Sequence, residues 1–399
     1  MSRGWVRAAG VVIAATAWGL WAGMGAPALA GESLIAGEEP VSVTVTWHTA
    51  PPEGRVAVRL DPQGVYLTEG YLAGEPAGWR LVAGKQRVRW GPGKVGALIL
   101  SDEGSFWGLL AERGWSVWGR DVKTAQLVAP LNPDQNRVFF AHRLESEVRP
   151  GLTVGISETA MASGDFTPWL YNPIPVWPYF LTQHLVWKSA GGSAQDYDIN
   201  CNLAVDARYR LASGAEVYGE FYADDAQSGI EDRARVPDMV GVLLGVSGWE
   251  PSFLPGWSAT VEYAALANWV YSHKNLLNNY VWEDGTPIGH WLGPDADALT
   301  VQVAREVAPG VERVVRLQHQ RHGEGEIGES WRPEYGKDGW FLSGVVETRY
   351  GVGVAERRRL SEKTTLKAGI EWLYRVNAGN QPGVREGAVN LKAELSLTL

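Results

Sequence analysis

Residues 196 to 211 alternate polar and apolar side chains almost without interruption. One parity carries mainly aspartate, asparagine and arginine, and the other carries tyrosine, isoleucine, leucine and valine. Successive side chains of a β-strand point to opposite faces, so the pattern predicts a strand with one wet face and one apolar face. The segment is longer than the roughly five or six residues of a usual sandwich strand. It is long enough to cross a membrane at a tilt, which takes about nine to eleven residues.

The same alternation recurs at 41–47, 365–376 and 388–399, and more weakly along the whole chain. About sixteen to eighteen candidate strands result. A β-sandwich also alternates, but 20 Trp and 14 Tyr with a mean hydropathy of only −0.16 favour a sheet that faces lipid on one side. A spanning sheet must close, because an open edge in lipid leaves backbone groups unsatisfied. We therefore predict an all-β fold, a closed antiparallel transmembrane β-barrel of about 16–18 strands.

The first thirty residues have the order of a secretory signal. Arg3 and Arg7 precede an apolar stretch, and Ala28-Leu29-Ala30 forms an A-x-A cleavage pattern. The alternative is an uncleaved N-terminal anchor helix, which Pro27 and the small residues near it disfavour. We expect residues 1–30 to be a cleavable signal peptide and residues 31–399 to be the barrel, exported to the outer membrane and surrounded by its lipid.

Charge and cysteine content exclude several classes of partner. The chain has a net charge of −9, and removing two arginines with the signal leaves about −11, which argues against nucleic acid. The lone Cys201 can form no intramolecular disulfide and no cysteine-rich zinc site. His319 and His322 are too few to define a metal centre. We expect neither a metal nor a cofactor.

The predicted connections differ in length. Those at 212–214 and 308–310 are tight, whereas others are long and rich in Trp, Gly, Pro and Asp. Outer-membrane barrels alternate short periplasmic turns with long external loops in this way. The long connections are expected at 102–136, 160–195, 224–238, 267–297 and 322–338.

The segment Trp90 to Gly96, WGPGKVG, cannot be an ordinary mid-strand stretch because it holds three glycines and a proline. It is either a tight inward loop that presents Lys94 to the lumen or a strand bend at a barrel corner. It lacks the Gly-Lys-Ser/Thr arrangement of a phosphate loop.

Polar residues on candidate strands are expected to line a wet lumen. There they would form an ion-pair network or bind an acidic sugar. Glu220, Asp224 and Asp225 also admit a glycosidase pair, a Ca²⁺ site or simply a solvated loop start, and no catalytic residue is assigned. The predicted lumen residues are Lys94, His142, Arg143, Glu158, Asn200, Asn202, Glu220 and Arg321.

Aromatic and amide side chains gather in the expected loop at 267–297. Aromatic faces stack on sugar rings, and amides pair with hydroxyl groups. The alternative is an interfacial belt that contacts lipid headgroups. The predicted polysaccharide-binding residues are Trp269, Tyr271, His273, Trp282, Trp115, Trp118 and Trp169.

Six short motifs occur in a fixed order: WGPGKVGALILSD at 90–102, AHRLE at 141–145, Asn172-Pro173, EFYADD at 220–225, GPDAD at 293–297 and RHGEG at 321–325. Taken together, they resemble the Wzi family of outer-membrane capsule-assembly proteins. The resemblance implies a large barrel that holds capsular polysaccharide as a lectin and not as an enzyme.

The chain departs from that family in two places. A strand pattern already begins at Val41, where the family often has a helical plug, so a more open barrel is expected. The last residue is Leu399 and not the aromatic residue that commonly ends bacterial barrels.

The function expected from the sequence is therefore non-catalytic binding or organisation of surface (capsular) polysaccharide. The alternatives are a general or substrate-selective porin and, third, an outer-membrane hydrolase that uses Glu220 or Asp224.

Overall fold

The computed structural model describes residues 34–37, 41–47, 53–61, 64–164, 168–171, 179, 199–225 and 237–398. The predicted signal peptide, residues 1–30, lies outside the described residues. The prediction about its cleavage therefore stays a prediction.

Strands make up most of the described structure. They are β1 (Leu34–Gly37), β2 (Val41–Trp47), β3 (Glu53–Asp61), β4 (Gly64–Gly74), β5 (Arg80–Gln86), β6 (Phe106–Val117), β7 (Arg120–Asn132), β8 (Arg137–Arg149), β9 (Leu152–Ala162), β10 (Asn200–Arg210), β11 (Glu216–Asp225), β12 (Met239–Trp249), β13 (Ser258–Leu266), β14 (Ala296–Ala308), β15 (Val311–His322), β16 (Glu347–Ser361), β17 (Thr364–Val376) and β18 (Arg385–Thr398). Short 3₁₀ helices are η1 (Pro76–Gly78), η2 (Pro133–Gln135), η3 (Pro168–Tyr171), η4 (Leu276–Asn278), η5 (Pro333–Tyr335) and η6 (Ala378–Asn380). No helix in these ranges is long and apolar enough to cross a membrane.

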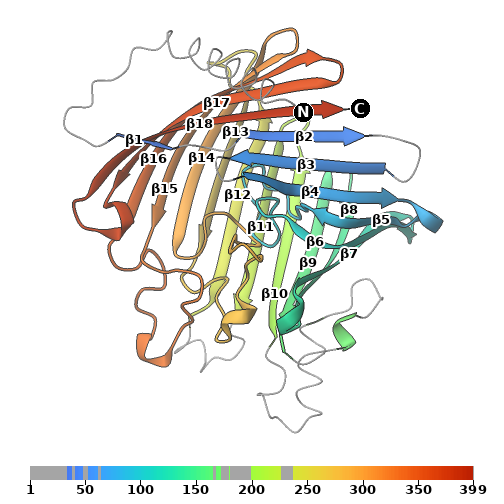
Figure 1. Cartoon of the computed structure of the whole chain (residues 1–399), viewed down its shortest axis with the longest axis vertical. Helices are drawn as coiled ribbons and strands as arrows, with labels where there is room; N and C mark the ends of the chain where they lie inside the picture. The colour runs from blue at the N-terminus through green and yellow to red at the C-terminus, as the bar shows by residue number, and fades with distance from the viewer. Residues whose placement is uncertain are drawn as a thin grey trace.

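The pairing of the strands runs in a ring. From β2 to β18 each strand pairs antiparallel with the next one in sequence, including β9 with β10. The ring closes where β18 pairs with β2, and β1 continues that seam along the earlier part of β18. The seam is parallel because an odd number of alternating strands leaves the first and the last running the same way. The predicted closed, antiparallel, all-β barrel is thus confirmed, with this one parallel seam (Figure 1).

Side-chain burial separates an inner face from an outer face. On β10 the side chains of Asn202, Ala204 and Asp206 are buried, whereas Leu203 and Val205 are 42% and 43% exposed. Large apolar side chains are exposed on one parity of the other strands too, as lipid contact requires. They include Leu109, Phe221, Leu244, Leu299, Leu317, Val352 and Leu391.

The two ends of the ring carry different connections. One end has mostly short turns, such as those at 118–119, 150–151, 309–310 and 362–363. The other end, at the bottom of Figure 1, has the long connections 87–105, 267–295 and 323–346. The prediction of a long loop at 102–136 is wrong, because β6 and β7 form a hairpin there.

Parts of three long connections, 87–105, 267–295 and 323–346, pack together inside the ring. Ala97 to Leu100 are fully buried, and so are Tyr271, Tyr280 and Ile288. They form one apolar cluster with inward residues of the strands. We call this filled part of the interior the loop-side half, and the part next to the short turns the turn-side half. The expected open barrel is therefore wrong for the loop-side half.

Candidate functional site

The motif at 90–96 belongs to a loop that enters the lumen. A backbone bridge from Trp90 to Leu100 closes its base. The backbone N–H groups of Lys94, Val95 and Gly96 then donate to the carboxylate of Glu262 on β13, at 2.6, 3.0 and 3.1 Å. Consecutive N–H groups that point into one space form a site for an anion, and here a wall carboxylate occupies it.

A second wall carboxylate holds the next turn of the same loop. Glu220 on β11 accepts hydrogen bonds from the N–H groups of Leu98 and Ile99, at 2.9 and 3.0 Å. The side chain of Lys94 forms an ion pair with Glu216 at 2.7 Å. Of the two interpretations of this motif, the structure shows the inward loop and not the strand bend.

The segment 267–295 packs against that loop. The hydroxyl groups of Tyr271 and Tyr280 donate to the carbonyl oxygens of Leu98 and Ile99, both at 2.6 Å. The ring of Trp282 stacks on Phe106 with centroids 4.5 Å apart. Aromatic rings fill this space because each hides a large apolar area and its polar tip still finds a partner.

This packing corrects part of the predicted sugar-binding set. Trp269, Tyr271 and Trp282 are 4%, 0% and 1% exposed, so their rings offer no free face to a sugar. His273 is half-buried, and its Nδ1 accepts the N–H of Asn275 at 3.2 Å. Trp269, Tyr271 and Trp282 are part of the buried interior, and His273 forms a hydrogen bond within its own segment.

His290 lies at the contact between the two inserted segments. A Cβ added at Gly96 would lie 2.3 Å from the imidazole ring, so only glycine fits against it. Burial, together with the charge of Arg89, lowers the pKa of His290 to about 3. The backbone N–H of Leu292 donates to Nδ1 at 3.2 Å, which requires that nitrogen to be unprotonated.

Buried polar groups also join the segment 323–346 to the interior. Asp295 accepts the N–H groups of Gly325 and Ser343, both at 3.0 Å. The side chain of Asn268 donates to the carbonyl oxygen of Gly339 at 2.9 Å. These bonds fix the base of a long outer connection to the filled half of the ring.

That connection carries exposed aromatic side chains. The ring of Tyr335 stacks on the buried Trp269, with centroids 6.2 Å apart and planes 7° apart, and remains 42% exposed. Trp340 is also 42% exposed, and its Nε1–H donates to the carbonyl oxygen of Asp238 at 2.7 Å. We call Trp331, Tyr335, Trp340 and Phe341 the outer aromatic surface. Sequence reasoning missed it, although four aromatic residues within 331–341 were a usable signal.

The other predicted aromatics lie elsewhere. Trp118 is in the β6–β7 turn and 97% exposed, so it belongs to the short-turn end. Trp115 stacks with the guanidinium of Arg113 at 4.4 Å on the outer face of the same hairpin, as expected of an interfacial belt. The prediction that these two tryptophans share a loop surface is therefore wrong. The side chain of Trp169 lies outside the described residues.

Five of the eight predicted lumen residues lie on the inner face: Lys94, Arg143, Asn200, Asn202 and Glu220. Arg143 forms an ion pair with Asp206 at 2.6 Å and another with Glu145 at 2.8 Å. Buried charges of this kind pair with one another, which was one of the two alternatives.

The prediction is wrong for the other three residues, because strand register places their side chains on the outer face. These residues are His142, Glu158 and Arg321. His142 pairs across β8–β9 with Glu158, at 3.1 Å between Nε2 and Oε2. Tyr179 covers the pair, and its backbone N–H donates to Glu158 at 2.9 Å, so neither side chain is exposed to lipid. Arg321 is bound to Asp297 near the rim at 2.5 Å. Polar residues thus occur on the outer parity where a neighbour covers or neutralises them.

No group of three or more possible metal ligands occurs in the ranges that the structure describes. The carboxylates of Glu220 and Glu262 accept backbone N–H groups, and the guanidinium of Arg143 forms ion pairs.

The closed ring, the apolar outer face and the two kinds of connection define an outer-membrane β-barrel whose lumen is filled on one side. Residues 114–380, more than half of the chain, match the sequence model of the family described as capsule assembly protein Wzi. The chain belongs to this family.

A solved structure agrees with the fold. Wzi from Escherichia coli, described as a carbohydrate-binding β-barrel involved in group 1 capsule assembly, matches over 86% of this chain and 75% of its own, with a TM-score of 0.59 and 15% identity. OccD3 (OpdP) and OprD from Pseudomonas aeruginosa cover 83% and 84% of this chain and 79% and 81% of their own, with TM-scores of 0.44 and 0.43 and identities of 10% and 12%. Among curated proteins, none matches the sequence.

Proposed function

We propose that this protein is a non-catalytic outer-membrane barrel that binds or organises surface (capsular) polysaccharide. Family membership supports the proposal, and the related Escherichia coli barrel is described as carbohydrate-binding. The observation that carries it is the outer aromatic surface, where Tyr335 and Trp340 are exposed on a connection fixed to the filled interior. In this proposal the protein reaches the outer membrane after cleavage of residues 1–30.

The geometry suits weak, repeated contacts with a polymer. Stacking an aromatic ring contributes about 0.5–1.5 kcal/mol beyond area burial, so one ring binds weakly and several together bind usefully. The buried ring of Trp269 fixes the orientation of Tyr335, which lowers the entropy lost on binding. The neighbours Arg332, Glu334, Lys337 and Asp338 are exposed and can bond to sugar hydroxyl groups.

The interior supports this function over the two alternatives. A general porin needs a wet passage, but the loop-side half is packed with fully buried aromatic and aliphatic side chains. A hydrolase would need free carboxylates, but Glu220 accepts two backbone N–H groups and Asp224 accepts the N–H of Tyr271 at 2.5 Å. These two carboxylates are used to hold the inserted segments in place.

The test replaces the two exposed rings together, as Tyr335→Ala with Trp340→Ala, in cells that make capsule. We expect the amount of cell-attached polysaccharide to fall at least threefold, while the amount of folded barrel in the outer membrane is unchanged. Trp118→Ala removes an even more exposed ring from the short-turn end and serves as the control. Unchanged retention in the double variant, with open-pore conductance of the purified protein, would replace this proposal with the porin.

A further inference from the structure

The inner wall of β14 to β18 forms a shallow trough in the turn-side half. Cross-strand register places its residues in three parallel rows. The first row is Gln302, Arg316, Gly353, Glu371 and Asn390. The second is Ala304, Val314, Ala355, Gly369 and Lys392. The third, nearest the turns, is Glu306, Glu312, Arg357, Lys367 and Glu394.

Small side chains of the middle row form the floor of the trough. Val314, Ala355 and Gly369 are small or apolar, and Gly353 adds an open position beside them. A cavity of about 530 Å³ lies over this floor, within the usual size range of ligand sites. Lys94 reaches it from the inserted loop. An apolar strip between two polar rows matches a sugar ring, which has apolar C–H faces and a polar rim.

The charges around the cavity are incompletely paired. Arg316 donates to the amide oxygen of Gln302 at 3.2 Å, and Lys392 lies 4.0 Å from Glu371. The side chain of Lys367 makes no ion pair or hydrogen bond with any described residue. These cations therefore keep charge that a bound anion could use.

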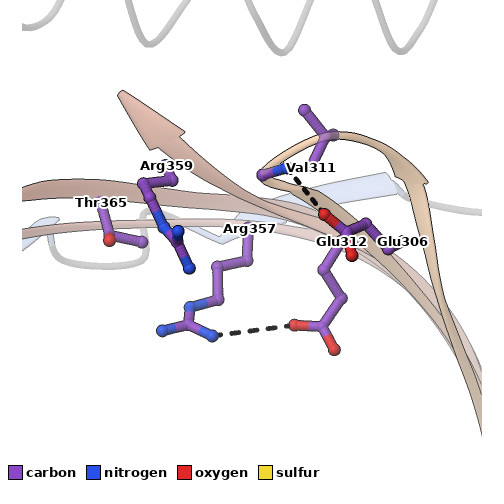
Figure 2. Close-up of a pocket in the computed structure, with 7 residues that line it drawn as sticks. Glu306, Val311, Glu312, Arg357, Arg359 and Thr365 are labelled. Carbon is purple, nitrogen blue, oxygen red and sulfur yellow. Dashed lines mark hydrogen bonds and ion pairs between the residues drawn. The ribbon is translucent and has the colours of Figure 1, made fainter. Parts of the chain in front are cut away.

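Charged side chains are also loosely paired at the rim of the trough, next to the short turns. Figure 2 shows Arg357 and Arg359 projecting from neighbouring positions of β16, with Arg357 directed toward Glu312. The contact between Arg357 and Glu312 is long, at 4.0 Å, and both side chains are exposed. Register places Arg357 beside Lys367, so two adjacent cations lie between the carboxylates of this row.

The opposite wall of the turn-side half is different. There Lys123 and Arg80 bind Glu112 at 2.9 and 3.3 Å, and Arg208 binds Glu145 at 3.4 Å. Each of these three cations has a carboxylate partner in hydrogen-bond range. These ion pairs are closer than the two 4.0 Å contacts of the trough, Lys392–Glu371 and Arg357–Glu312.

We propose that the trough is a binding site for a carboxylate-bearing sugar unit of a glycan that enters from the short-turn end. The sugar ring lies over Ala355 and Gly369, and its carboxylate binds Lys367 and Lys392. This inference rests on the proposed function, because it takes the ligand to be a carbohydrate. It goes further in proposing that the ligand is negatively charged and that a second site lies on the periplasmic side. Short turns mark that side in barrels of this kind.

The test is calorimetric titration of the purified full-length barrel in detergent with trigalacturonate and with neutral maltotriose. We expect trigalacturonate to bind more tightly, with an affinity that falls as salt is added, because exposed charges are screened. Lys367→Gln with Lys392→Gln should weaken trigalacturonate binding at least tenfold and flatten the salt dependence. Lys123→Gln, on the opposite wall, should change it less than twofold.

A second variant tests shape and not charge. Gly353→Leu projects a side chain over the floor, and a Cβ there meets no atom nearer than 3.7 Å, so the barrel should still fold. We expect it to abolish trigalacturonate binding. Equal affinities for the two trisaccharides in the native protein would overturn the proposal, as would unchanged binding in the trough variants.

The two sites can be told apart. Replacing Tyr335 and Trp340 should reduce capsule retention and leave trigalacturonate binding intact. If retention proves independent of those rings but trigalacturonate still binds, only the outer surface is wrong. If the trough variants bind normally while the ring variant loses capsule, only the trough is wrong.

Discussion

The two halves of the interior use their charges in opposite ways. In the loop-side half, the carboxylates of Glu220 and Glu262 are buried and accept five backbone N–H groups between them. In the trough of the turn-side half, acidic and basic side chains face a cavity and pair loosely, as Arg357 and Glu312 do at 4.0 Å. The first arrangement fixes a loop in place, and the second leaves charge available to a ligand.

The difference follows from what each half encloses. Inserted backbone brings N–H groups that lose water and need acceptors, so inward carboxylates there become structural. Where no backbone enters, the same residue types stay hydrated. An inward-facing Glu is therefore not by itself a functional residue. Its partner decides whether it holds the fold together or remains free for binding.

The largest test of this contrast is Glu262→Ala. The change removes the acceptor of three N–H groups and of the Tyr218 hydroxyl, which donates at 2.8 Å. Buried donors left unsatisfied cost about 1–3 kcal/mol each, and partial relaxation should leave a net loss of roughly 4 kcal/mol. We expect urea unfolding in lipid vesicles to show this loss and planar bilayers to show a higher conductance.

Glu371→Ala is the matched control in the turn-side half. Its nearest cation is 4.0 Å away, so we expect stability and conductance close to those of the native barrel. A Glu262→Ala protein with native conductance would show that the inserted loop does not depend on this carboxylate.

Glycines in the two halves give the next test. Gly96→Ala places a Cβ 2.3 Å from the ring of His290, whereas at Gly353 the nearest atom is 3.7 Å away. Overpacking costs about 1–3 kcal/mol, so Gly96→Ala should lower the free energy of unfolding by that amount. Gly353→Ala should be neutral or slightly stabilising, because alanine restricts the unfolded chain. Equal effects in urea unfolding would contradict a filled loop-side half.

The sequence predicted the fold well because alternation along a strand is a local property. Of the expected strand at 196–211, residues 200–210 form β10, and its apolar side chains Leu203, Val205 and Tyr209 do face outward. Residues 196–198 lie outside the described residues. The sequence also limited WGPGKVG to two interpretations, one of which was right. Because side chains of a strand alternate with a period of two, a short stretch of sequence is enough to predict a strand and its outward face.

The interior could not be predicted in the same way. The contact between Lys94 and Glu262 joins residues far apart in the chain, and no local pattern encodes it. Alternation identified Asn200 and Asn202 as inward but misplaced His142 and Glu158, because Tyr179 covers them from outside. Parity gives the side of the sheet only when no other segment covers a polar outer position.

A smaller effect is expected from pH. The pKa of His290 is about 3 in the fold and 6.5 in an unfolded chain, so between these values the unfolded state binds a proton that the folded state does not. Stability should therefore fall as the pH falls, by about 1 kcal/mol between pH 6.5 and 5.5. His290→Asn keeps an acceptor for the N–H of Leu292 and does not titrate. Urea unfolding at the two pH values should show a smaller difference in this variant, and an unchanged difference would exclude His290 as its source.

The smallest effect is expected for Glu312→Gln at the turn-side mouth. The carboxylate is 46% exposed, and its partner Arg357 is 64% exposed at 4.0 Å. Exposed ion pairs contribute about 0–1 kcal/mol, since water screens the attraction and both side chains lose freedom when they pair. We expect urea unfolding to change by less than about 0.5 kcal/mol. The same substitution removes a negative charge beside Lys367, the neighbour of Arg357 in the third row, so trigalacturonate should bind slightly more tightly. A loss of stability comparable to that of Glu262→Ala would show that the turn-side charges also hold the fold together, and the contrast between the two halves would fail.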